Sequence, residues 1–200
     1  MVSPTANRAC LLGSAMMIAA AASIGCCAGV LWHMRARHQH VLRELGRAQT
    51  DPTTQLLTRQ PWETAVGSFL HPSAEVGFLD MADFKAINDT YGHTVGDRVL
   101  AWTARRLATS LPTGSLATRW AGDEFAFVSP HAVPWRHLLE QLAEPVPISS
   151  TESLRPAAAL GVVRVGALPE HPPGLPDAIR AADVAMYHAK HAGTGVCHIS

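Results

Sequence analysis

The chain has 200 residues, a length that suits one domain with a short appendage rather than two enzymes. Its 16 acidic and 16 basic residues cancel, so the net charge gives no support for a nucleic-acid partner. A hydrophobic fraction of 48% with a charged fraction of 16% excludes a disordered chain, a collagen-like chain and a coiled-coil rod. Four cysteines are too few for a disulfide scaffold, and we interpret them as free thiols.

The N-terminal part predicts a membrane anchor. After a tail over residues 1–8, residues 9–32 contain no charged side chain, and as a helix they would span roughly 36 Å, enough to cross a bilayer core. A cleaved signal peptide remains the alternative, although its apolar core is usually shorter. One arginine precedes the run and four follow it closely, which predicts a single-pass protein of the inner or plasma membrane with its C-terminal domain in the cytoplasm.

Residues 33–50 predict a basic helical linker, because apolar residues recur there at helical spacing. His33, His38 and His40 suggest a metal site as one alternative, but no carboxylate or thiolate completes the ligand set. A solvated face attracted to anionic lipid next to the membrane is the interpretation we favour.

From residue 51 onward, helical and strand patterns alternate. Helices are expected at 62–70, 96–111, 135–144 and 176–192, and strands at 74–81, 115–120, 124–129, 157–165 and 196–199. Residues 121–123 read as a hairpin turn between two of these strands. Strands interleaved with helices, including a hairpin, predict an α/β (α+β) domain with a central mixed sheet flanked by helices.

Acidic residues stand at two points where strands end. Asp80 ends an otherwise apolar strand, and Asp123 and Glu124 lie at the tip of the expected hairpin. If the hairpin lies beside the strand of Asp80, the carboxylates converge into an oxygen-rich site suited to Mg²⁺. Gly122 would let the backbone approach a ligand closely. Acidic hairpin tips are usually solvated turns, so this pattern alone leaves both interpretations open.

Four segments, in order, resemble the motifs of the GGDEF family of diguanylate cyclases, and together they cover residues 51–200. They are the opening turn DPTTQLLTR (51–59), the stretch FLDMADFKAINDTYGHTVGD (78–97), the loop RWAGDEF (119–125) and the helix ADVAMYHAK (182–190) followed by Gly193. The resemblance implies a nucleotidyl-cyclase-like palm as the fold. It also implies condensation of two GTP molecules into cyclic di-GMP with release of pyrophosphate, for bacterial second-messenger signalling, by a homodimer in which each domain holds one GTP.

The resemblance also implies roles for individual residues. Asp80, the main-chain carbonyl of Met81 and Asp123 would hold Mg²⁺ (or Mn²⁺), with Glu124 supporting the metal site. Asp123 would also lie near the attacking 3′-hydroxyl as the base.

Further residues would bind the nucleotide. Asn88 and Asp97 would read guanine, while Ala121 and Gly122 would lie against the nucleotide. Lys85 and Lys190 would face the phosphates, and they are the only two lysines among 16 basic residues.

Several positions depart from the family pattern. Ala121 replaces the first glycine of the loop, at a cost of roughly 1 kcal/mol if that residue requires a left-handed backbone. Thr194 stands where the family has a phosphate-binding arginine, and a hydroxyl cannot replace that charge. Gln55 replaces a glycine, and Pro112 and Ser115 occupy the ends of an inhibitory Arg-x-x-Asp product site, so feedback through that site is not expected.

Because the metal carboxylates, the guanine readers and both lysines are present, an active cyclase is the function that the sequence favours. The alternative is a catalytically inactive GGDEF-like domain that binds GTP or another protein. Ala121 and Thr194 are the features that favour this alternative.

Overall fold

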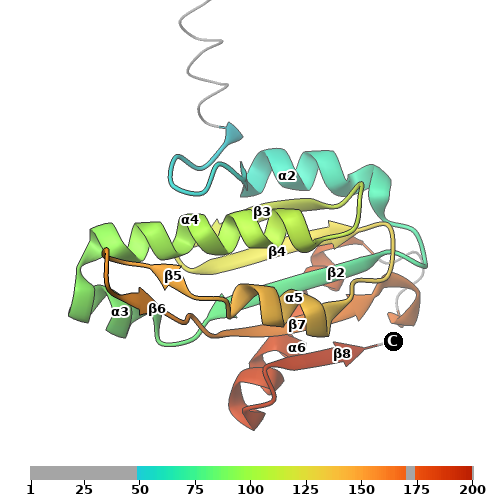
Figure 1. Ribbon diagram of the computed structural model, residues 1–200. Helices are drawn as coiled ribbons and strands as arrows, with labels where there is room; N and C mark the ends of the chain where they lie inside the picture. The colour runs from blue at the N-terminus through green and yellow to red at the C-terminus, as the bar shows by residue number, and fades with distance from the viewer. Residues whose placement is uncertain (1–48, 170–173, 200) are drawn as a thin grey trace, which may run out of the picture. The chain divides into compact units, whose positions relative to one another are not determined.

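The structure, a computed structural model, describes residues 49–169 and 174–199 (Figure 1). The chain divides into two units, Met1–Gly46 and Arg47–Ser200, and every described residue belongs to the second. The predicted tail, membrane helix and nearly all of the predicted linker therefore lie outside the described residues. Among the residues that are described, no helix has the length and apolar character needed to span a membrane.

A six-stranded mixed sheet forms the centre of the domain, with the order β1-β3-β4-β2-β7-β8. Each neighbouring pair in the middle of the sheet, β3–β4, β4–β2 and β2–β7, is antiparallel. The two edge strands, β1 and β8, pair in parallel with β3 and β7. The strands are β1 (Leu57–Thr58), β2 (Glu75–Met81), β3 (Leu116–Ala121), β4 (Glu124–Ser129), β7 (Ala158–Arg164) and β8 (Val196–Ile199). The prediction of a mixed sheet that contains a hairpin is confirmed.

Helices cover both faces of this sheet, and each face has its own hydrophobic core (Figure 1). The helices α2 (Arg59–Val66) and α6 (Leu175–Ala192) pack on one face, around Trp62 and Phe78. The helices α3 (Phe84–Tyr91), α4 (His93–Ser110) and α5 (Trp135–Leu142) belong to the other core, around Phe125 and Phe127. Because side chains alternate along a strand, β2 contributes to both cores.

Gly161 allows α6 to lie directly on β7. A Cβ atom at this position would come within 2.0 Å of the carbonyl oxygen of Ala182 and 2.3 Å of the backbone nitrogen of Met186. Only glycine permits so close an approach of helix backbone to strand backbone. This contact sets the position of α6, which carries Lys190 at its far end.

The structure adds elements that the sequence patterns did not predict. The helix α3 lies in residues for which the sequence patterns predict no helix. The helix α4 begins at His93 rather than at the predicted residue 96. Short strands β5 (Val146–Pro147) and β6 (Ser153–Leu154) form a separate hairpin, and the 3-10 turns at Gly67–Phe69 and Val165–Ala167 follow α2 and β7. Two-residue strands and single turns leave too short a pattern for periodicity to detect.

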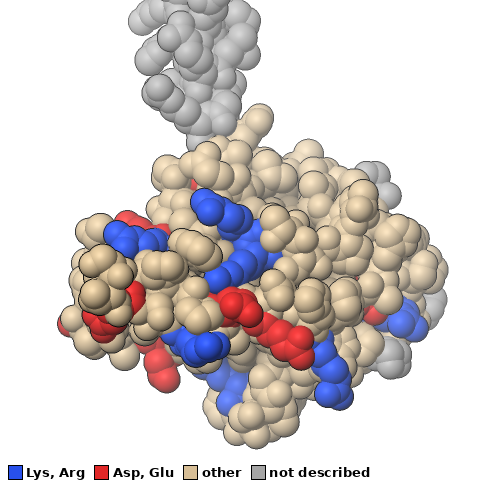
Figure 2. Space-filling view, in the orientation of Figure 1, with Lys and Arg blue, Asp and Glu red and all other residues tan. Residues whose placement is uncertain are grey.

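The surface on the side of α4 and α5 carries acidic and basic side chains side by side (Figure 2). This agrees with the balanced composition of the chain.

Gln55 adopts a left-handed backbone conformation, with φ at 61°, and its side-chain amide donates a hydrogen bond to the carbonyl of Pro52. A left-handed conformation costs a non-glycine residue about 1–2 kcal/mol in the folded state. Replacement by glycine removes this cost, but it also raises the entropy of the unfolded chain, which offsets part of the gain in stability. We therefore expect Gln55→Gly to raise the free energy of unfolding by about 0.5 kcal/mol in urea titration. Gln55→Val should lower it, because a β-branched residue tolerates this region least; equal stability of the two variants would contradict the interpretation.

Candidate active site

Three carboxylates gather at one edge of the sheet because of the register of β2 and β4. Asp80 lies directly opposite Glu124 in this antiparallel pair, and Asp123 precedes Glu124 in the hairpin. The backbone nitrogen of Met81 donates a 3.3 Å hydrogen bond to the carbonyl oxygen of Asp123, which fixes the hairpin beside the end of β2. The convergence predicted from the sequence is thus present in the fold.

The carboxylates repel one another, and burial adds to this cost. Burial raises the pKa of Asp123, and the charge of Asp80 raises it further. The pKa of Glu124 is raised by burial and then by the charges of Asp80, Asp123 and Asp183. Like charges on directly opposite cross-strand neighbours destabilise a sheet, so this edge is electrostatically unfavourable without added positive charge.

Lys190 supplies one positive charge from α6. Its Nζ lies 2.5 Å from Oδ1 of Asp80, and this hydrogen bond raises the pKa of the Lys190 ammonium above its usual value. The Asp80 side chain is only 15% exposed, whereas that of Lys190 is 44% exposed. The ammonium therefore holds the carboxylate from the solvent side, where a phosphate could also reach it.

The donor set at this edge fits a magnesium ion that shares its ligands with a phosphate. Asp80 and Asp123 would provide carboxylate oxygens, and the carbonyl of Met81 would add a third hard ligand of the kind that Mg²⁺ prefers. Within the described residues, no three His, Cys, Asp or Glu side chains are gathered closely enough to form a metal cage by themselves. Mg²⁺ in proteins usually relies on one or two carboxylates together with substrate phosphates and water.

An ion pair between Arg119 and Asp51, here called the brace, supports the hairpin. The guanidinium of Arg119 donates from Nε to the carbonyl of Gly122 at 2.8 Å and from Nη1 to both carboxylate oxygens of Asp51, at 3.2 and 3.1 Å. Although burial opposes ionisation, hydrogen bonds from Thr54 and the charge of Arg119 lower the pKa of Asp51. Both side chains are less than one fifth exposed, so the pair connects the start of the domain to the acidic tip.

The sequence patterns did not predict this brace, although Asp51 and Arg119 lie in the segments 51–59 and 119–125 that resemble family motifs. The available signal was an arginine two residues before the turn in a strand that is otherwise largely apolar. Pairing it with a residue 68 positions earlier required the tertiary structure.

We expect Arg119→Lys to lower the free energy of unfolding by about 1–2 kcal/mol, because one ammonium cannot reach Asp51 and Gly122 as a guanidinium does. Urea titration measures this loss. The matched control is Arg180→Lys, where the arginine side chain is 72% exposed and pairs with Asp177 at 3.5 Å. Its effect should stay below about 0.5 kcal/mol; an equal loss in both variants would show that the brace has no special role.

The hairpin tip accommodates alanine at position 121 without a left-handed backbone at that residue. Gly122 adopts a left-handed conformation, with φ at 51°, whereas Gln55 and Asp83 are the only non-glycine residues with positive φ in the described part of the chain. Ala121 still pairs with Glu124 across a bulge in the β3–β4 ladder. The strain considered for Ala121 therefore does not arise, and the glycine that the turn requires is Gly122.

The two residues expected to read guanine lie close together where α3 meets α4. The side chain of Asn88 packs on Gly96, where an added Cβ would come within 2.0 Å of its Oδ1, and Asp97 follows on α4 with its side chain exposed. Asn88 and Asp97 therefore lie on neighbouring helices, and their recognition of guanine stays a prediction.

Lys85 and Thr194 both have partners within their own segments of the chain. Lys85 lies in the first turn of α3, and its Nζ donates to Asp89 at 2.6 Å, so in this structure it is paired within its own helix rather than with the acidic edge. The Thr194 hydroxyl donates to the carbonyl of Val196 at 3.1 Å. Thr194 therefore serves the turn that leads into β8 and brings no charge to the site.

The fold is an α/β domain with three carboxylates and one lysine at one edge of its sheet, a donor set of the kind that binds a divalent cation together with phosphate groups. The family described as "Diguanylate cyclase, GGDEF domain" matches residues 48–195. The chain belongs to the GGDEF family.

The chain is similar to proteins of several bacteria. An uncharacterised 19.3 kDa protein of Streptomyces ambofaciens is 42% identical over 160 residues, covering 78% of this chain and 86% of that protein. The cyclic di-GMP phosphodiesterase PdeB of Shewanella oneidensis is 34% identical over 160 residues, covering 76% of this chain but only 18% of PdeB. The crystal structure of a sensory box/GGDEF family protein from Caulobacter crescentus is similar with a TM-score of 0.63 and 32% identity, covering 73% of this chain and all of that one.

Proposed function

We propose that this protein is a diguanylate cyclase, which condenses two GTP molecules into cyclic di-GMP and releases two pyrophosphates. The observation that supports this most directly is the sheet edge where Asp80, Asp123 and Glu124 gather beside Lys190. Three carboxylates in mutual repulsion lower stability, and a bound cation with a phosphorylated substrate would remove that cost. Membership of the family agrees with this function.

Each residue has a role in this proposal. Asp80, the Met81 carbonyl and Asp123 would hold Mg²⁺, which when bound neutralises phosphate charge. Asp123 would also accept the proton of the 3′-hydroxyl as it attacks the α-phosphorus, and burial raises its pKa toward the range where a carboxylate is a better base. Lys190 would donate to a phosphate and Glu124 would support the metal site. Asn88 and Asp97 would bind the guanine edge, while Lys85 would turn from Asp89 to the phosphates.

The reaction requires two domains that face each other, since each holds one GTP. In-line transfer of this kind depends on positioning and on charge neutralisation rather than on a covalent intermediate. The homodimer is therefore part of the proposed active unit, and the rate per molecule should rise with protein concentration.

The test is to incubate the full-length chain with GTP and Mg²⁺ over a wide range of protein concentrations and to separate the nucleotides. Cyclic di-GMP and pyrophosphate in a ratio of one to two, with no turnover of ATP, would support the proposal. GTP that binds but stays unconverted at the highest concentration would overturn it in favour of a non-catalytic GTP-binding module. The feature that favours this module is Thr194, which brings no positive charge.

We also propose that residues 9–32 anchor the protein in the membrane with the GGDEF domain in the cytoplasm. The uncharged run and the arginines that follow it support this. Cell fractionation tests it: the full-length chain should stay in the membrane pellet at alkaline pH. Release into the supernatant, or a mature N-terminus beyond residue 32, would contradict the anchor.

A further inference from the structure

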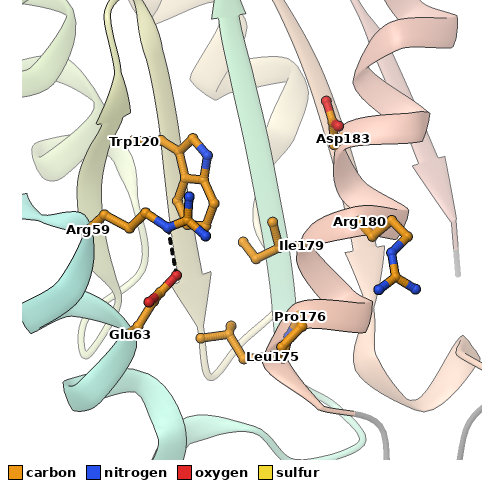
Figure 3. A pocket seen from close by; sticks show the side chains of 8 residues that line it. All are labelled: Arg59, Glu63, Trp120, Leu175, Pro176, Ile179, Arg180 and Asp183. Atoms are coloured by element: carbon orange, nitrogen blue, oxygen red, sulfur yellow. Dashed lines mark hydrogen bonds and ion pairs between the residues drawn. The ribbon is translucent and has the colours of Figure 1, made fainter.

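Arginine side chains hold this domain together in two different ways. In the pocket between α2 and α6, Arg59 pairs with Glu63 of its own helix and covers the indole ring of Trp120 (Figure 3). Arg180 on the opposite wall pairs with Asp177, which precedes it on α6. Both ion pairs join residues of one helix, so they stabilise single helices rather than connect distant segments of the chain.

Arg98 on α4 forms a contact of the other kind. Its Nη1 donates to the carbonyl of Pro147 at 3.4 Å and to that of Ile148 at 2.7 Å, and these residues lie 49 and 50 positions further along the chain. Pro147 ends β5, and the hairpin of β5 and β6 lies at the end of the domain where α3 meets α4 (Figure 1). A guanidinium has several donors in one plane, so a single arginine can hold neighbouring carbonyls.

Arg106, about two turns further along α4, holds the same segment at its other end. Its guanidinium donates to the carbonyls of Glu144 and Pro145, at 2.6 and 3.1 Å. Residues 144–148, here called the strap, therefore run along α4 in the opposite direction, between two arginines. The two contacts use the same chemistry and differ in the part of α4 that they hold.

The part held by Arg98 is the start of α4. Asp97, which is expected to read guanine, directly precedes Arg98, and Gly96 packs against the side chain of Asn88. The N-cap of the helix is Gly92, with φ at 82°, and no side chain caps the first turn. Helix ends leave backbone N–H groups without partners and open more easily than helix centres. The bond to the strap therefore adds a restraint from another segment to an end of α4 that lacks a side-chain cap.

Recognition of a base depends on this restraint more than binding of phosphate does. Hydrogen bonds weaken steeply when donor and acceptor lose their alignment, so a carboxylate that reads guanine must keep its direction. If the start of α4 opened, Asp97 would move, whereas the acidic edge and Lys190 belong to other elements and would stay in place. The loss would then fall on the choice between bases.

We propose that Arg98 is a positioning residue for nucleotide recognition, which holds the start of α4 against the strap so that Asp97 and Asn88 keep their places for guanine. The inference rests on the proposed function, because the guanine site is part of it. Arg106 has no such role, since it holds the strap about two turns further from Asp97.

Calorimetric titration of full-length variants with two triphosphate analogues in Mg²⁺ tests this role. One analogue carries guanine and the other adenine, and in both a methylene group replaces the oxygen between the α- and β-phosphorus atoms. The bond that the proposed reaction breaks is thereby blocked, so binding is measured without turnover. Arg98→Ala should weaken binding of the guanine analogue by at least about fivefold and that of the adenine analogue by less than about twofold, which lowers the preference for guanine.

Two further variants separate positioning from a general loss of structure. Arg106→Ala removes the same kind of contact from the other end of the strap, and should change the preference for guanine by less than about twofold. Arg98→Lys keeps a cationic donor that can reach one carbonyl, and should stay within about threefold of the parent. Urea titration of each variant checks that it remains folded.

An unchanged preference in Arg98→Ala, or an equal loss in Arg98→Ala and Arg106→Ala, would overturn the positioning role. Equal binding of both analogues by the parent protein would overturn the guanine site itself, and this inference with it. A parent that prefers guanine but forms no cyclic di-GMP would contradict the cyclase alone, and the loss of preference in Arg98→Ala would still support the role of Arg98.

Discussion

Replacing Asp123 by asparagine is expected to lower cyclic di-GMP formation by at least about 10³-fold. The substitution removes a carboxylate oxygen that would hold Mg²⁺ and would accept the proton of the attacking hydroxyl. The hairpin should keep its shape, since the backbone carbonyl of Asp123, which accepts from Met81, is unchanged. Steady-state rates with GTP and Mg²⁺ measure this loss. The matched control is Glu140→Gln on the exposed surface of α5, which should retain full activity.

The same variant should be at least as stable as the parent in EDTA at pH 7. Because the pKa of Asp123 is raised above its ordinary value of 3.8 in the folded state, the folded protein binds this proton more readily than the unfolded one. The ionised carboxylate therefore costs stability, and the cost appears as the pH rises through the raised pKa. The difference between variant and parent in urea titration should shrink as the pH falls to about 4. A variant that loses activity and stability together would show that Asp123 acts mainly through the fold.

Substituting Gly161 by alanine is expected to lower the free energy of unfolding by about 3 kcal/mol or more. The added methyl group would lie 2.0 Å from the Ala182 carbonyl and 2.3 Å from the Met186 nitrogen, and both atoms belong to the backbone of α6. A helix backbone cannot move aside as a flexible side chain can. Urea or thermal unfolding measures the loss, and turnover should fall with it, because α6 carries Lys190 to Asp80.

Gly67→Ala is the matched control for this substitution. Gly67 is exposed, has an ordinary helical φ of −54°, and an added Cβ would meet no atom within 4 Å. Its stability should stay within about 0.5 kcal/mol of the parent, or rise slightly through the lower entropy of the unfolded chain. A loss at Gly67 as large as that at Gly161 would mean that the effect reflects backbone flexibility and not the contact with α6.

The acidic edge explains why substitution of its carboxylates should lower activity without lowering stability. Asp80 and Glu124 are direct cross-strand neighbours, and a sheet selected for stability alone would avoid two carboxylates there. The fold tolerates them through Lys190 and through the brace that Arg119 forms with Asp51. Local repulsion of this kind is typical of sites that are completed by a cation and a phosphorylated ligand.

The sequence alone predicted most of the sheet and the residues of the acidic edge. Continuous apolar runs in β2 and β4 indicate strands with two buried faces, and Gly122 defines the turn between β3 and β4. These signals are local, because apolar runs and turn conformation depend on residues within a few positions of one another. The elements missed, such as β1 and the β5–β6 hairpin, have strands of only two residues, which are too short for a period to be detected.

Contacts between distant residues were decided only by the tertiary structure. The pairing of Lys190 with Asp80 joins positions 110 residues apart, and that of Arg119 with Asp51 joins positions 68 apart. The stacking of Arg59 on Trp120 likewise depends on how α2 lies against the sheet. Sequence patterns supplied the identity of the charged groups, while the packing of α2, α6 and the opening turn against the sheet determined their partners, because an ion pair forms only where the folded backbone brings two side chains within reach.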